Sequence, residues 1–541
     1  MSLASGIDVR RFSWIRPLVA DYADNFESVA ALYVGNPSRS DAWRSAIERA
    51  QTHPRRRADV AALIRAQQDR REAHADARAA AERLAERDTV AVVTGQQAGA
   101  FGGPLYTLLK AVTAIQLARR TSTEYGVPTV PVFWVEAEDH DWDEVRSVTV
   151  LDGELQPSTI QLAAPEGAGQ LPVAALRVDE RVEESLAALK AALAPTDFTE
   201  WTLSGLRAAW RPGEGMGAAF ARWLEGLLGP HGLVVFESSD PGAKPLVAEL
   251  FARELQFPGR TATLASGAGK QLSEHGHQPQ VIPQPDSLAL FKVDGARRAI
   301  RQQDGILMVG DETHDVGRLA SEAVEHPEHF SPNVLLRPIV QDSLFPTICY
   351  VAGPSELAYL GQLRGVYQHF GVPMPLIYPR GSATLLDSAA TRFLAKHDLP
   401  IEELQAKDDS ALNRLLQSQL PKSVDSALAD AQAEIRRRMD RLIEVMPDVD
   451  PTLAGAAKTT LGRMEHDLKS LHGKVIQAAK KRDDTLRRQF TRTQAQIFPT
   501  GHPQERTLGV VFFLNRYGPA LIDRLLEELP LDMGRHWLLT I

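Results

Sequence analysis

The sequence is poor in cysteine: its 541 residues include a single one, Cys349. One thiol cannot form an intramolecular disulfide and cannot build a Cys-based zinc site. This composition fits a reducing compartment, so we expect a cytoplasmic protein. Cys349 lies within an apolar run, which predicts a buried core residue rather than a nucleophile.

Long apolar runs and an excess of positive charge are also missing. No stretch approaches the roughly 18 apolar residues that a membrane-spanning helix needs, and the acidic N-terminal region does not resemble a secretion signal. The formal net charge is −9 and the pI about 6.0, whereas nucleic-acid-binding domains are normally basic. We therefore expect neither a membrane nor a nucleic acid as partner.

What the chain does contain is the composition of a globular protein, with 44% hydrophobic and 24% charged residues. Its length suits two or three packed units. Residues 40–88 read as helical, and a strand, a helix and a second strand then follow at 90–93, 104–125 and 130–135. Further strand-like runs occupy 233–236, 346–351 and 376–378. Strand–helix–strand units form parallel sheets, so we predict an open α/β core over residues 1–385, with insertions at about 151–230 and 258–330.

Residues 386–500 have a different pattern. Apolar side chains recur at spacings of three and four, for example Leu428, Ala431 and Ile435, and again Leu461, Met464 and Leu468. Such heptad-like stripes predict a long antiparallel α-helical hairpin, a coiled-coil arm suited to dimerisation. Residues 501–541 regain apolar density, and we expect them to pack back on the core.

Polar runs directly follow the predicted strands. In an open parallel sheet, ligands bind outside the carboxyl ends of the strands, which all lie on one edge. If the strands are parallel, these runs converge on one cleft. The runs are 94–97, 136–144, 238–240, 353–356 and 378–381.

The first run opens a glycine-rich loop before a helix that starts at Pro104. Glycines allow a ligand to approach the backbone closely, and a helix N-terminus favours an anion. The spacing matches neither the P-loop nor the dinucleotide fingerprint, and a tight turn without a ligand is the alternative. The residues that we expect to contact a substrate here are Thr94, Gly95, Gln96, Gln97, Gly102, Gly103 and Tyr106.

The second run places several carboxylates around one histidine, between two tryptophans. This pattern suggests acid–base work, amine recognition or a magnesium site, while a solvated acidic loop that caps the next helix is the alternative. We assign Asp139, His140 and Asp141 to catalysis and Trp134 and Glu138 to substrate binding. A single histidine without cysteine makes zinc improbable, and we assign no metal-ligating residue.

The third run centres on Arg337, whose guanidinium can grip a carboxylate with two hydrogen bonds. A structural salt bridge is the alternative. The remaining predicted substrate-binding residues are Asn333, Gln341, Asp342, Gly353, Glu356, Tyr378 and Arg380.

Five ordered motifs resemble those of a known family. They are Val93–Gly99 with Phe101–Thr107, Pro131–Val135 with Glu138–Asp141, Phe330–Pro338 with Gln341 and Asp342, Gly353–Tyr359, and Phe370–Pro375. The family is that of the bacillithiol biosynthesis cysteine-adding enzymes (BshC). The resemblance spans nearly the whole chain, including the predicted arm.

This resemblance implies a Rossmann-like core with connecting insertions and a coiled coil used for homodimerisation. It also implies a ligase that joins L-cysteine to glucosaminyl-malate. Because a carboxylate and an ammonium do not condense in water at useful rates, we expect ATP, optionally with Mg²⁺, to activate the carboxylate. Two rival hypotheses remain at this point: a nucleotidyl transferase on the same core, and a ligand-binding scaffold without turnover.

Overall fold

The computed structural model describes residues 5–405, 408–418, 422–482 and 484–541. The chain forms two compact units. The first comprises Met1–Leu385 and Pro503–Ile541, and the second comprises Leu386–His502.

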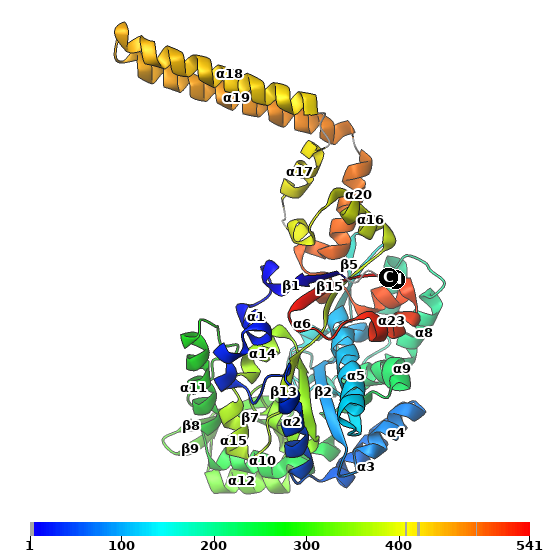
Figure 1. The fold of residues 1–541 in the computed structure, drawn as a ribbon. Helices are drawn as coiled ribbons and strands as arrows, with labels where there is room; N and C mark the ends of the chain where they lie inside the picture. Colours follow the sequence, from blue (N-terminus) through cyan, green and yellow to red (C-terminus); the bar gives the residue numbers. More distant parts are fainter. Residues whose placement is uncertain (1–4, 406–407, 419–421, 483) are drawn as a thin grey trace. The chain divides into compact units, whose positions relative to one another are not determined.

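A five-stranded sheet lies at the centre of the first unit (Figure 1). All its neighbouring strands run parallel, which confirms the predicted α/β core. In spatial order the strands are β13 (Leu376–Pro379), β12 (Thr347–Ala352), β2 (Val90–Gln97), β3 (Thr129–Glu136) and β6 (Val234–Glu237).

Both faces of this sheet are buried, as parallel sheets require. Val90 and Val92 point to one face and pack with α2 (Ser40–Thr52) and α5 (Leu105–Tyr125). Ala91 and Val93 point to the other face and join a larger apolar cluster. The helices that contribute to this cluster include α3 (Arg57–Arg71), α4 (Ala75–Arg83), α10 (Lys244–Gln256), α13 (Arg337–Leu344), α14 (Pro354–Leu360) and α15 (Arg364–Phe370).

Helix α5 connects β2 to β3. It begins directly after Pro104 and ends at Gly126, whose φ of 66° closes the last turn in the left-handed conformation that favours glycine. Its apolar residues lie on all sides because the sheet covers one side and α23 (Ala520–Glu528) packs on another. Buried helices of this kind lack a polar face.

The region 151–230 contains a hairpin and three helices. The elements are β4 (Ser147–Leu151), β5 (Pro157–Gln161), α7 (Val182–Ala192), α8 (Thr199–Ala209) and α9 (Met216–Leu228), and α6 (Trp142–Val145) precedes them. Helix α9 packs on β3 and β6 and thereby joins this region to the central sheet.

The region 258–330, which we predicted to be an insertion, has regular structure of its own. It contains most of a second, antiparallel sheet of order β10-β9-β8-β7-β11. The turn between β8 and β9 carries Asp304 and Gly305, both with positive φ, a pairing typical of two-residue hairpins. The elements are α11 (Arg260–Glu274), β7 (Ser287–Asp294), β8 (Ala296–Gln303), β9 (Ile306–Val309), β10 (Glu312–His314), α12 (Val316–Glu325) and β11 (Phe330–Pro332).

The segment Pro503–Ile541 belongs to the first unit. Its last strand lies between the first strand of the chain and β14, in the order β1-β15-β14. The elements are β1 (Ser5–Asp8), α1 (Pro17–Asp24), β14 (Ser382–Leu386), α21 (Gln504–Thr507), α22 (Val510–Tyr517) and β15 (Arg535–Thr540).

The second unit is built around a helical hairpin, which confirms the predicted coiled-coil arm. Its two long helices, α18 (Lys422–Val445) and α19 (Leu453–Arg482), lie side by side and run in opposite directions (Figure 1). The other helices of this unit are α16 (Ser388–His397), α17 (Ser410–Ser418) and α20 (Asp484–Ile497).

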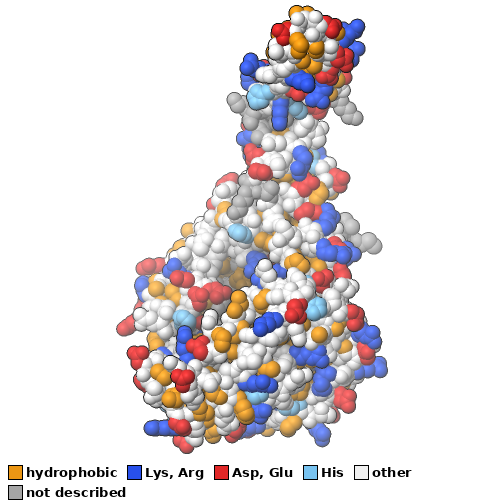
Figure 2. Space-filling model, turned by 90° about the vertical axis from the view of Figure 1, so that its left-hand side faces the viewer, with side chains coloured by type: hydrophobic (Ala, Val, Ile, Leu, Met, Phe, Trp, Pro, Cys, Tyr) orange, Lys and Arg blue, Asp and Glu red, His pale blue; other side chains and the backbone are white. Residues whose placement is uncertain are grey.

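The charges of the described residues are mixed. Figure 2 shows acidic and basic side chains interspersed over the visible face rather than gathered into one basic patch. Within the described ranges, every helix is too short or too polar to cross a lipid bilayer.

Candidate functional site

The order of the strands defines where a ligand site belongs. Strand β2 comes first in the chain; β3 and β6 follow it on one side of the sheet, and β12 and β13 then lie on its other side. The direction of winding therefore reverses between β2 and β12. In sheets of this type, the region outside the carboxyl ends of the strands at such a switch point is the preferred ligand site, and we call this region the switch-point crevice.

A buried ion pair bridges this switch point. Lys110, on α5, donates to the carbonyl of Gly95 at the end of β2 and pairs with the carboxylate of Glu356 on α14. Glu356 also accepts from the Tyr350 hydroxyl (2.7 Å) and the Gly353 N–H (2.7 Å). Burial would raise the pKa of Glu356, but Lys110 outweighs it and holds that pKa below the ordinary value. The pair thus ties the two loops of the switch point together.

Arg337 lies beside this pair with neutral hydrogen-bond partners. Its guanidinium donates to Gln341 Oε1 (3.0 Å) and to the Tyr359 hydroxyl (3.1 Å), and its central carbon is 5.9 Å from the ring centroid of Tyr350. In the part of the chain that the structure describes, no carboxylate forms an ion pair with it. A guanidinium without a paired anion is costly in a low-dielectric crevice, so Arg337 is suited to receive an anionic group.

Glu136, the last residue of β3, contributes a carboxyl group on the same edge. It accepts from Trp134 Nε1 (3.2 Å) and from the Glu138 N–H (2.9 Å). Burial, and secondly the charge of Glu138, raise the pKa of Glu136, while Arg337 opposes the shift. A carboxyl group with a raised pKa is suited to accept and release a proton near neutral pH.

A second cleft of about 490 Å³ lies outside the ends of β3 and β6. On its wall, Glu138 accepts from Lys244 (2.8 Å) and from the Ser331 hydroxyl (2.6 Å). Arg70 and Arg177 also line it. Glu138 is therefore a neighbour of Glu136 along the chain but is committed to its own hydrogen bonds.

The three residues assigned to catalysis, Asp139, His140 and Asp141, follow Glu138 in the same loop. Asp139 lies 3.2 Å from His140 Nδ1 and 3.3 Å from Arg297. The Asp141 carboxylate accepts the Glu144 N–H (3.1 Å) and caps α6, as the alternative interpretation of this run anticipated. Among the described residues, no hydrogen bond or ion pair joins these three side chains to Arg337 or Glu356.

Two glycines of the glycine-rich loop are packed closely against other parts of the protein. A side chain at Gly95 would meet the carbonyl oxygen of Trp134 at 2.8 Å, and one at Gly102 would meet the ring of Trp223 at 2.3 Å. The start of α5 is closed as well, because the Leu105 N–H donates to Leu508 (2.8 Å). Gly95 and Gly102 therefore serve the packing of the core, and the substrate contacts that we assigned to this loop stay a prediction.

Replacing Gly102 with alanine should lower the free energy of unfolding by about 2–4 kcal/mol, since it combines a clash with Trp223 and a φ of +96°. Gly226→Ala is the matched control on α9, the helix that carries Trp223, because nothing lies within 4 Å of its added carbon. This control should stabilise by about 0.5–1 kcal/mol. Urea unfolding measures both. Equal effects at the two positions would contradict the packing role of Gly102.

Several other predicted site residues contact one another next to the crevice. Gln96 donates to the Tyr106 hydroxyl (3.2 Å), and Arg380 stacks at 5.5 Å from the ring centroid of Tyr106. Arg380 is committed to a buried salt bridge with Glu505 (2.7 and 2.9 Å).

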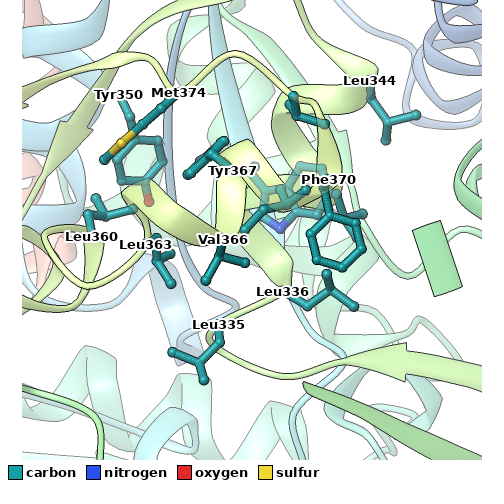
Figure 3. Packing of buried hydrophobic residues seen from close by; sticks show 14 of the residues in the cluster. Leu335, Leu336, Leu344, Tyr350, Leu360, Leu363, Val366, Tyr367, Phe370 and Met374 are labelled. Carbon is teal, nitrogen blue, oxygen red and sulfur yellow. The ribbon is translucent and has the colours of Figure 1, made fainter. Parts of the chain in front are cut away.

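The remaining predicted residues have structural roles. Gln341 and Asp342 are buried, and Tyr367 donates to Asp342 within the apolar cluster shown in Figure 3. Asn333 accepts from the Leu335 N–H (2.8 Å). The other contacts are Thr94 to the Val351 carbonyl (2.9 Å), Gln97 to Glu144 (2.9 Å), Gly103 to the Val510 N–H (3.0 Å), and Tyr378 in the cluster on the α2 face.

The predicted site residues did not include four side chains of the crevice, Lys110, Glu136, Tyr350 and Tyr359, although Glu136 begins the predicted polar run 136–144. Lys110 carried a usable signal, since it is a lone charge within the apolar run Leu108–Val112. A charge in the middle of a buried helix needs a partner. Tyr350 and Tyr359 carried no such signal, because aromatic residues in apolar runs are ordinary core residues.

Comparison with known proteins agrees with this architecture. Residues 6–381 match the family model of the BshC N-terminal Rossmann-like domain in bacillithiol biosynthesis, and residues 383–541 match the BshC C-terminal coiled-coil domain. The chain belongs to the BshC family. The BshC Rossmann-like model covers the whole crevice except Glu505, and the coiled-coil model includes the segment 503–541, which packs in the first unit.

Curated BshC relatives cover nearly the same length. A protein of Salinibacter ruber is 34% identical over 96% of this chain and 95% of its own. One of Koribacter versatilis is 34% identical over 94% of both chains, and one of Symbiobacterium thermophilum is 35% identical over 83% of this chain and 84% of its own. Each of these relatives is named "Putative cysteine ligase BshC".

Proposed function

We propose that this chain joins the carboxyl group of L-cysteine to the amine of glucosaminyl-malate and so forms the amide bond of bacillithiol. The observation that carries this proposal is Arg337, a guanidinium in the switch-point crevice whose hydrogen-bond partners are the neutral Gln341 and Tyr359. Both substrates carry carboxylates, and a planar guanidinium binds a carboxylate with two hydrogen bonds. The names of the relatives favour cysteine as one substrate.

The cysteine carboxylate must be activated before an amine attacks it, and we propose ATP as the source of activation. When bound, ATP converts a carboxylate oxygen into a leaving group. Two cations near the crevice are already neutralised, because Lys110 is paired with Glu356 and Arg380 with Glu505. For this reason we do not expect these two side chains to bind the phosphates of ATP. We therefore assign Arg337 to a substrate carboxylate rather than to the nucleotide.

The amine must lose a proton to attack, and we propose Glu136 as the group that accepts it. The raised pKa of Glu136 suits this role. Glu136 is also among the charged groups that shift the pKa of Arg337 most, whereas Asp139, His140 and Asp141 are not. This proposal moves the proton-accepting role away from His140, whose side chain is 53% exposed.

Glu136→Gln should lower kcat by about 10²–10⁴-fold, the range for loss of a general base, whereas His140→Ala should keep most of the activity. Glu136→Gln should also flatten the acid limb of the pH–rate profile, because activity rises as Glu136 loses its proton. Steady-state kinetics of the two variants, with the fold checked by circular dichroism, compare the assignments. The reverse result, an inactive His140→Ala beside an active Glu136→Gln, would restore the role to His140.

The direct experiment is mass spectrometry of a reaction that contains purified protein, cysteine, glucosaminyl-malate, ATP and Mg²⁺. Bacillithiol formed together with an equal amount of ADP or AMP supports the ligase. Substrate binding without turnover contradicts it and favours a scaffold. Pyrophosphate release without cysteine favours a nucleotidyl transferase.

We further propose a homodimer formed through the coiled-coil arm, acting in the cytoplasm, where a free thiol substrate stays reduced. Five large apolar side chains of the arm are 40% or more exposed: Leu442, Val445, Val449, Met464 and Leu471. Exposed apolar side chains of this kind favour an interface.

A further inference from the structure

Two histidines and a glutamate meet where α12 leads into β11. His326 Nδ1 lies 3.3 Å from Glu328 Oε1, and His329 Nε2 lies 3.9 Å from the same oxygen. One ligand atom from each of the three residues lies within 4.8 Å of the others. Within the described ranges, this is the one group of three or more such side chains with this spacing. The two imidazole rings are stacked, with centroids 5.2 Å apart and planes 17° apart.

The surroundings orient His329 as a metal ligand. Its Nδ1 lies 3.0 Å from Glu322 Oε1, and Lys292 contacts the same carboxylate. With Nδ1 donating to this carboxylate, His329 keeps its lone pair on Nε2, which faces Glu328. A carboxylate on the far nitrogen is the usual support of a metal-bound histidine.

We propose that His326, Glu328 and His329 bind a divalent transition-metal ion of the zinc type. Imidazole nitrogens combined with one carboxylate favour zinc over magnesium and calcium, which prefer oxygen ligands. Ligand atoms about 2.0–2.2 Å from a tetrahedral ion lie roughly 3.3 Å from one another, so small side-chain rotations complete the site. Our sequence analysis assigned no metal-ligating residue and did not consider this cluster.

The site has an open position beside the second cleft. Three protein ligands leave the fourth tetrahedral position free for water or another small ligand. Glu328 lines that cleft together with Ser331 and Lys244, and His329 directly precedes β11, which carries Ser331. A bound ion would thus lie at the rim of the cleft and fix the chain just before Ser331, whose hydroxyl donates to Glu138.

The test uses the full-length chain without an affinity tag, first stripped with a chelator and then titrated with Zn²⁺ alone against a chromophoric competitor. We expect a single ion per chain. His326→Ala, Glu328→Gln and His329→Ala should each weaken zinc binding by more than about 100-fold. Glu322→Gln, which removes only the support of His329, should weaken it by about 10–100-fold.

His275→Ala is the matched control, because His275 is another exposed histidine beside a glutamate, Glu274. It should leave zinc affinity unchanged. Substitution with Co²⁺ provides an independent readout, since a tetrahedral site gives intense visible absorption that His329→Ala should abolish. Zinc affinity that survives in the His326→Ala/His329→Ala double variant, or that falls equally in His275→Ala, would overturn the proposal.

Discussion

Arg337→Met is expected to lower kcat/KM for bacillithiol formation by between about 30-fold and about 5,000-fold. This range corresponds to about 2–5 kcal/mol, the loss on truncating one partner of a buried, hydrogen-bonded charge pair. Methionine keeps most of the side-chain length, so the change removes the charge and the two-pronged donor while preserving much of the packing. The neutral partners of Arg337, Gln341 and Tyr359, leave its charge available for a substrate.

The kinetic constants also identify which substrate Arg337 holds. A KM that rises for glucosaminyl-malate alone places a malyl carboxylate at this residue, and a KM that rises for cysteine alone places the amino-acid carboxylate there. Arg253→Met is the control, because Arg253 is exposed and donates to the His369 carbonyl. Unchanged kinetics in Arg337→Met would remove the observation on which the proposed function depends.

Arg380→Met is expected to lower the free energy of unfolding by about 3–5 kcal/mol, the cost of leaving a buried charge without its partner. The side chains of Arg380 and Glu505 are 5% and 4% exposed, and they share two hydrogen bonds. Arg436→Met is the control: its pair with Glu465 is largely exposed, and such pairs contribute less than about 1 kcal/mol. Denaturant unfolding followed by circular dichroism measures both variants.

A double variant separates the two sources of this loss. Arg380→Met with Glu505→Met replaces the whole pair with apolar groups, which is often close to neutral, so most of the stability should return. If the double variant is no more stable than Arg380→Met, the unpaired charge is not the cause. In the wild type the contribution of Glu505 is present above the ordinary glutamate pKa and falls as the pH drops below it, because Arg380, against the effect of burial, lowers the pKa of Glu505.

The positions of the parallel strands could be predicted because strands covered on both faces appear as continuous apolar runs that end in polar residues. Once the strands are known, topology brings the polar ends to one edge. What the sequence does not reveal is which side chains at that edge point into the crevice. Tyr378 lies near the end of β13 and Arg380 directly follows this strand, yet Tyr378 packs on the α2 face and Arg380 pairs with Glu505.

The glycine-rich loop shows a second limit. Its glycines suggest a ligand, but the partner of Gly102 is Trp223, which lies on a distant helix and has no sequence relation to the loop. Close backbone packing and ligand approach require the same residue, so a glycine pattern alone does not distinguish them. The antiparallel sheet, in contrast, carried a readable turn signal at Asp304-Gly305 that our sequence analysis did not use.

The return of the chain to the first unit has a consequence for the folding of the newly synthesised polypeptide. The start of α5 is closed by Leu508, the loop after β13 is neutralised by Glu505, and β14 lies beside β15. During synthesis on the ribosome, these earlier segments therefore lack their partners until the polypeptide beyond residue 503 has emerged. The hairpin of α18 and α19 depends on contacts between its own two helices, and local contacts form quickly. During synthesis from the N-terminus, the arm can thus complete its folding while the first unit still lacks its C-terminal segment and exposes surface to which chaperones can bind.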